Sequence, residues 1–131
     1  MILIVLVLKN KIMEIKERIK FLLPLCEEQF YKLSEYLCKE DAERLAPIVL
    51  DSIIRAQIKV HEELINTSKN LLESRIKKQS KLGEFTLDSV HCFERGSYSG
   101  MIIAHEGRIK THETYLSELK MDLEILQLKL I

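Results

Sequence analysis

The sequence predicts an all-α protein, an elongated antiparallel helical bundle or coiled coil of about three helices. The 131 residues are 47% hydrophobic and 31% charged, with only 4 glycines and 2 prolines. Such a composition has too few turn residues for a β architecture and too many apolar residues for a disordered chain. Apolar residues also recur at spacings of three and four, which is the period of an amphipathic helix. We therefore predict one helical domain over residues 13–131, preceded by an apolar extension at residues 1–12.

The extension at residues 1–12 opens with a run of Ile, Leu and Val. This run is far shorter than the ~20 residues of a membrane span and lacks the features of a signal peptide. It is either a short buried segment or sequence translated upstream of a true start at Met13. The first helix is predicted over residues 13–38, because one apolar face keeps its phase across Pro24. A proline inside a helix removes a backbone hydrogen bond, so we expect a kink there rather than a new helix.

The second helix is predicted over residues 41–82, with Asp41 as its N-cap and Gly83 as its C-terminal stop. Pro47 either kinks its first turns or occupies an early helical position. Two neighbouring apolar stripes make its apolar face wider than a coiled-coil seam, so the helix must contact partners on two sides. The first stripe comprises Leu45, Val49, Ile53, Ala56, Val60, Leu64 and Leu71, and the second comprises Ile48, Ile54, Ile58, Ile65, Leu72 and Ile76. We expect burial of Leu64, Leu71 and Leu72, with a loss of about 2–5 kcal/mol for each change to alanine.

A connection is predicted at residues 83–100, which lose the helical period and hold three of the four glycines. The third helix is predicted over residues 100–130, because its residues alternate spacings of three and four as a heptad seam. The seam comprises Ile102, His105, Ile109, His112, Leu116, Leu119, Leu123, Leu126 and Leu130. A line of exposed leucines would aggregate, so the first two helices or another protein must cover the seam. A homodimer is one way to do so.

No residue pattern in the chain is typical of an enzyme. The chain shows neither the nucleophile-and-base pattern nor the paired carboxylates of a hydrolase, and the segment from Gly96 to Gly100 lacks the spacing and the lysine of a phosphate-binding loop. The three cysteines form no CxxC pair, which favours a reducing cytoplasm and argues against a disulfide framework. Basic and acidic residues both number 20, so no net field attracts nucleic acid or an anionic membrane. We predict no catalysis, cofactor, metal, nucleic-acid partner or stable membrane insertion.

The histidines of the third helix raise the question of a metal site. His105 and His112 share one helix face but lie about 10 Å apart along the axis, too far to hold one ion. Across a homodimer seam each could meet its symmetry mate, which gives a metal-binding or pH-sensitive contact as the alternative to histidines tolerated in the seam. His91 and Cys92 are neighbours in the predicted connection, but no matching cluster supports a catalytic or ligand role for them.

Two short segments resemble one protein family. Residues 65–76, which include Asn66, Asn70 and Leu72, resemble an Asn- and Leu-containing segment in the long helix of FlgN-type flagellar export chaperones. The residues Ser97-Tyr98-Ser99-Gly100 are similar to a tyrosine- and glycine-containing element that follows that helix in the family.

The resemblance implies a cytoplasmic, non-catalytic chaperone that binds a helical segment of a secreted hook–filament junction protein. It implies substrate contacts by Asn66, Asn70, Leu72 and Ile76, and a contact of Tyr98 with an export-gate component. The heptad seam adds further candidate partner-binding residues, which are Leu116, Leu119, Leu123 and Leu126. The alternative is a coiled-coil adaptor or stalk subunit of a secretion or other assembly, similar to FliJ-like proteins.

Overall fold

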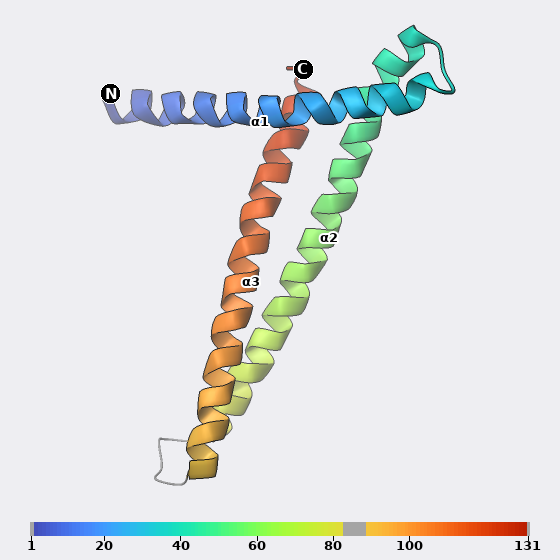
Figure 1. The fold of residues 1–131 in the computed structure, drawn as a ribbon. Coiled ribbons are helices and arrows are strands. Elements are labelled where there is room, and N and C mark those ends of the chain that lie inside the picture. Colours follow the sequence, from blue (N-terminus) through green and yellow to red (C-terminus); the bar gives the residue numbers. More distant parts are fainter. Residues whose placement is uncertain (1, 83–88, 131) are drawn as a thin grey trace. The chain divides into compact units, whose positions relative to one another are not determined.

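The computed structural model describes residues 2–82 and 89–130. These residues form α1 (Ile2–Ser34), α2 (Lys39–Lys81) and α3 (Ser89–Gln127), and they contain no strand (Figure 1). The predicted all-α class with three helices is therefore confirmed.

The chain divides into two compact units that share two of the helices. Unit 1 comprises Met1–Ile58 and Ser117–Ile131, and unit 2 comprises Lys59–Leu116. Unit 1 contains all of α1, the first part of α2 and the end of α3, whereas unit 2 contains the remainder of α2 and α3.

Helix α1 begins well before the predicted start at Met13. The described part of the extension, from Ile2 onward, continues the same helix and is exposed rather than buried. Pro24 lies inside α1 without dividing it, which agrees with the expected single helix. The helix ends at Ser34 rather than at Cys38. The amide of Leu37 closes the following turn by donating to the carbonyl of Leu33 at 2.9 Å.

Helix α2 begins two residues earlier than predicted, at Lys39. Asp41 is therefore part of the first turn rather than the N-cap, and the amide of Ala42 donates to the carbonyl of Cys38 at 2.9 Å. The acidic side chains of Glu40 and Asp41 still favour this end, because they face the positive end of the helix dipole. Pro47 lies inside the helix. The predicted stop at Gly83 lies outside the described residues.

Helix α3 begins at Ser89, so the connection predicted at residues 83–100 is wrong over residues 89–100. The glycines suggested a loop, but a helical glycine costs only about 1 kcal/mol relative to alanine, which packing can offset. Here the amide of Gln79 on α2 donates to the hydroxyl of Ser99 at 2.5 Å and to the carbonyl of Arg95 at 3.2 Å. Residues 83–88 lie outside the described part of the chain.

The C-terminal end of α3 forms a Schellman motif. Lys129 has a φ of 54°, its amide donates to the carbonyl of Leu126, and the amide of Leu130 donates to the carbonyl of Ile125. These are the bonds that satisfy the last carbonyls of a helix when the following residue is left-handed. Glycine is the usual residue at that position, and lysine occupies it here.

We expect Gly100→Ala and Gly107→Ala to stabilise the protein by about 0.5–1 kcal/mol each. Both residues lie inside α3, and a Cβ built on either one has no heavy atom within 4 Å. Alanine therefore lowers the entropy of the unfolded chain without a clash. Urea unfolding followed by circular dichroism measures the effect, and a loss of stability in either variant would contradict the packing described here.

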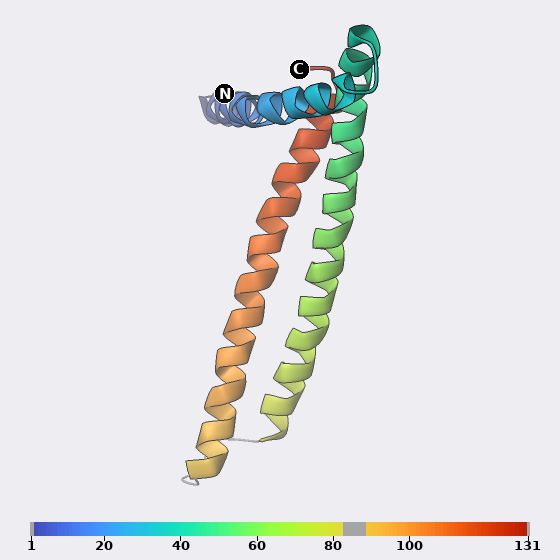
Figure 2. The same ribbon diagram turned by 45° about the vertical axis from the view of Figure 1, so that its right-hand side comes forward.

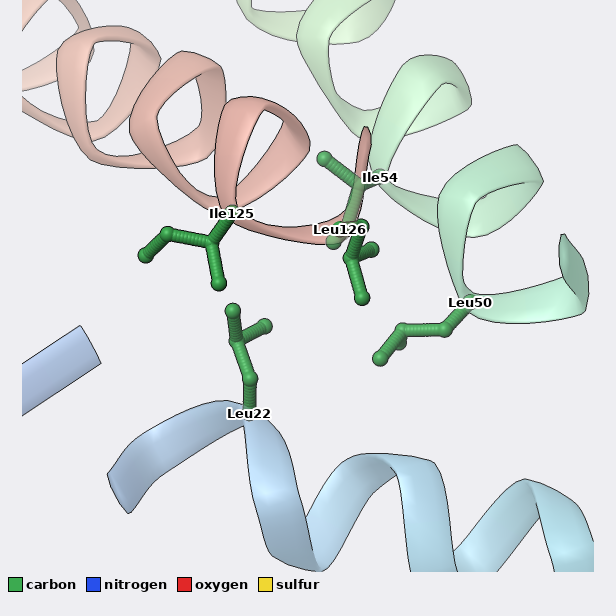
Figure 3. Close-up of a cluster of buried hydrophobic side chains, with 5 residues drawn as sticks. All are labelled: Leu22, Leu50, Ile54, Ile125 and Leu126. Carbon is green, nitrogen blue, oxygen red and sulfur yellow. The ribbon is translucent and has the colours of Figure 1, made fainter. Parts of the chain in front are cut away.

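The core of unit 1 is a cluster of five aliphatic side chains from all three helices (Figure 3). Figure 3 shows Leu22 of α1 pointing toward Ile125 of α3, while Leu50 and Ile54 extend from α2. Leu126 completes the cluster. Leu22 is 0% exposed and Ile125 2% exposed, so this is the best-covered apolar region of the described chain.

An ion pair joins α1 to α3 beside this core. The Nε and Nη2 atoms of Arg18 donate to the two carboxylate oxygens of Asp122 at 2.7 and 2.6 Å, and the Asp122 side chain is only 1% exposed. The hydrogen bond to Asp122 raises the pKa of Arg18 above its ordinary value, against the opposing effect of burial. The guanidinium also lies 4.5 Å from the centre of the Phe21 ring. This bidentate pair adds a geometrically specific contact between the two helices.

Unit 2 is a pair of helices that run side by side in opposite directions (Figures 1 and 2). Ile65 of α2 and Ile109 of α3 are buried, but so are the polar residues Ser68 and His105. The Nδ1 atom of His105 has no hydrogen-bond partner among the described residues. The interior of this unit is therefore more polar than that of unit 1.

Candidate partner-binding surface

A row of large apolar side chains on α2 is uncovered in unit 2. Val60, Leu64 and Leu71 are 53%, 41% and 40% exposed. Their spacings of four and seven place them on one side of the helix, and we call them the α2 stripe. The predicted burial of Leu64 and Leu71 is wrong, and Leu72 is half-buried.

The α2 stripe is exposed because unit 2 offers α2 a single neighbouring helix. The seam facing α3 follows a heptad spacing, and its residues are all buried or half-buried. In unit 2 they are His61, Ile65, Ser68, Leu72, Arg75 and Gln79. The second partner that the two stripes predicted for α2 does not come from the described residues of unit 2.

Two exposed residues of α3 extend the α2 stripe into a wider surface. Met101 is 39% and Tyr115 is 50% exposed. Helical geometry at 100° per residue places both on the side of α3 that borders the α2 stripe. The ring of Tyr115 lies 5.7 Å from that of His61 on α2, which agrees with this placement. The opposite side of the pair is charged, and Lys69 and Glu113 approach to 3.8 Å there.

The residues implied by the family resemblance do not gather at one site. Asn66 and Asn70 are exposed one turn apart on α2, and Ile76 is 46% exposed. At 100° per residue these three side chains project away from the α2 stripe. Tyr98 lies inside α3 rather than in a connection, and it is half-buried.

The heptad seam of α3 is covered by the chain itself. Leu126 is buried in the unit 1 cluster, and Leu119 and Leu123 pack against that cluster while partly buried. Leu116, in unit 2, is half-buried. Leu119, Leu123 and Leu126 were predicted to bind a partner, but in this structure they are core residues. Leu130, at 48% exposure, is the seam position that stays open.

His112 faces a histidine of α2 within the same chain. The Nδ1 atoms of His61 and His112 are 2.9 Å apart, and the ring centres are 5.1 Å apart. The sequence pattern did not reveal His61, because the two stripes on α2 were defined from apolar residues alone. His61 occupies a heptad position of the α2 seam, so a heptad search that included polar residues would have identified it.

The described residues include no cluster of three or more histidines, cysteines or acidic residues that could hold a metal ion. In the same part of the chain, no helix is long and apolar enough to span a membrane. Cys26 and Cys38 are free thiols. Burial, and to a smaller extent the charge of Glu27, raises the pKa of Cys26, so its thiol is protonated at neutral pH.

Unit 1 also has a half-open groove of about 560 Å³ between α2 and the end of α3. It is lined mostly by polar and charged side chains of α2, with Ile48 and Leu126 as apolar members. Asp51 in this groove is already engaged by Arg55 at 2.6 Å. Its lining suits an apolar helix less well than the α2 stripe does.

Comparison of the chain with protein-family models, curated proteins and solved structures gave no match.

Proposed function

We propose that this protein is a non-catalytic, cytoplasmic chaperone that holds an amphipathic helix of a partner protein against unit 2. The observation that carries the proposal is the exposed α2 stripe, bordered by Met101 and Tyr115 on α3. A helix that docks in this way presents apolar residues at spacings of three, four and seven, which match the spacing of the α2 stripe. The partner helix would supply the second neighbour that α2 lacks.

The resemblance to FlgN-type chaperones supports the choice of partner. It points to a helical segment of a secreted hook–filament junction protein as the bound helix. Tyr98, half-buried on α3, is the candidate for contact with the export gate. Tyrosine suits such a contact, because it supplies a large area at a low cost in conformational entropy.

The amount of apolar surface is suited to reversible binding. Full burial of an aliphatic side chain contributes roughly 1.5–3 kcal/mol, and the three residues of the α2 stripe are already about half covered. Their combined contribution is therefore a few kcal/mol. A chaperone must release its substrate, and a helix bound through an interface of this strength dissociates without a large barrier.

The test measures binding of a synthetic peptide that carries the terminal helix of the junction protein from the same organism. We expect Leu64→Gln and Leu71→Gln each to weaken binding at least tenfold, which corresponds to about 1.4 kcal/mol. The matched control is Ile103→Gln, since Ile103 is 69% exposed on another side of α3. Isothermal titration calorimetry of the four proteins measures the affinities.

Circular dichroism must show that all three variants keep their helix content. Equal affinity in the wild type and both α2 variants would place the peptide elsewhere. A loss of affinity in the Ile103 control as well would indicate unspecific hydrophobic binding.

A further inference from the structure

The histidine pair of unit 2 places two imidazole nitrogens at the separation of neighbouring ligands of one metal ion. His61 of α2 and His112 of α3 are half-buried, and their Nδ1 atoms lie 2.9 Å apart. The rings are tilted by 45°, so they do not stack. In the absence of a metal this distance suits a hydrogen bond between the two nitrogens, whose direction depends on the tautomers of the two rings.

We propose that His61 and His112 bind a divalent transition-metal ion through their Nδ1 atoms, with Cu²⁺ or Ni²⁺ favoured over Zn²⁺. The proposal goes beyond the proposed chaperone function and does not depend on it.

The separation of the two nitrogen atoms selects the coordination geometry. Metal–imidazole bonds of about 2.0–2.1 Å that meet at a right angle place their nitrogens about 2.9 Å apart, as square-planar or tetragonal sites require. Bonds of the same length that meet at the tetrahedral angle would place the two nitrogens about 3.3 Å apart. Cu²⁺ and Ni²⁺ adopt the right-angled geometry and Zn²⁺ the tetrahedral one, so the observed 2.9 Å between the two Nδ1 atoms matches the separation that Cu²⁺ or Ni²⁺ requires.

The surroundings leave the remaining coordination positions to water. No third histidine, cysteine or carboxylate joins the pair among the described residues. Glu113, next to His112 in sequence, is engaged by Lys69 at 3.8 Å. The Tyr115 ring lies 5.7 Å from His61 and shields one side of the pair. Two protein ligands make a weak, exchangeable site rather than a permanent structural one.

A metal at this position would link α2 to α3. An ion that binds the folded chain more tightly than the unfolded chain raises stability by mass action. Both ligands come together only when the two helices are paired, because they are 51 residues apart in sequence. Metal binding should therefore stabilise the helix pair.

The experiment uses the full chain without a histidine tag, freed of metal by a chelator, at pH 7.5. We expect NiCl2 to bind one ion per chain in isothermal titration calorimetry. His61→Gln and His112→Gln should each lower the affinity by at least about tenfold, since loss of even an outer-shell partner of a metal site costs that much. His105→Gln is the control, because His105 lies one heptad away in the same seam and should leave the affinity unchanged.

Electron paramagnetic resonance of the Cu²⁺ complex gives a readout that does not depend on stability. We expect two coordinated imidazole nitrogens in the wild type and in the His105 control, and one in each of the other two variants. The proposal is overturned by unchanged Ni²⁺ affinity in either His61→Gln or His112→Gln, by one ion per two chains, or by absence of Ni²⁺ binding at millimolar concentration.

Discussion

Replacement of Arg18 by alanine should destabilise the protein by about 3–5 kcal/mol, because it leaves a buried carboxylate without its partner. The side chain of Asp122 is 1% exposed, and both of its oxygens accept hydrogen bonds from Arg18. Arg18 is the cation that pairs with Asp122 among the described residues, so no other described group replaces the lost charge. Urea unfolding at neutral pH measures the loss.

Two further variants separate the cost of an orphaned charge from the net value of the pair. The double change Arg18→Met with Asp122→Leu should recover most of the stability, because well-packed apolar residues often replace a buried ion pair at no cost. Lys32→Ala is the surface control, since its pair with Glu28 is exposed on both sides and should be worth less than about 1 kcal/mol. A loss below about 1 kcal/mol for Arg18→Ala would show that water reaches Asp122 in the folded state.

The period of apolar residues was sufficient to predict the number and phase of the helices. It predicted one helix through Pro24, and it predicted which face of α3 is covered, from Ile102 to Leu126. Helix ends were less predictable, because they depend on signals that packing can override. The glycines at 96 and 100 suggested a loop, yet Gln79 holds that segment to α2 as a helix.

Periodicity could not decide which of the two stripes on α2 is buried. Both have helical spacing and similar side chains, and only the position of the neighbouring helix separates them. Ile65 is buried at 6% exposure, whereas Leu64, the residue before it, is 41% exposed. A sequence fixes the angle between two such residues on a helix but not the direction of its partner. The candidate surface therefore became visible only with the tertiary structure.

Polar contacts between distant residues were beyond the reach of sequence patterns. Arg18 and Asp122 are 104 residues apart, and neither has a sequence context that separates it from the other charged residues. His61 and His112 each occupy a heptad position, but a single histidine in a seam does not indicate its partner. Such pairs require the register between two helices, which the core packing of each unit sets.

Replacement of Leu22 by alanine should lower the free energy of unfolding by about 2–5 kcal/mol, because Leu22 lies in the core of unit 1. Leu22 is 0% exposed and packs in a cluster with side chains of all three helices (Figure 3). Truncation removes apolar contact area and leaves a cavity that the surrounding helices fill only in part. Leu23→Ala is the matched control, because the neighbouring leucine is 43% exposed and should cost much less.

Native-state hydrogen exchange shows which part of the protein Leu22→Ala destabilises. Helix α1 lies wholly in unit 1, where Leu22 and the Arg18–Asp122 pair attach it to the other helices. We therefore expect the amides of the second half of α1 to show the largest rise in exchange rate in Leu22→Ala. The amides of residues 2–14 should change little, since these residues are exposed along their whole length. Equal destabilisation by Leu22→Ala and Leu23→Ala would mean that the face of α1 that carries Leu22 does not pack against the core.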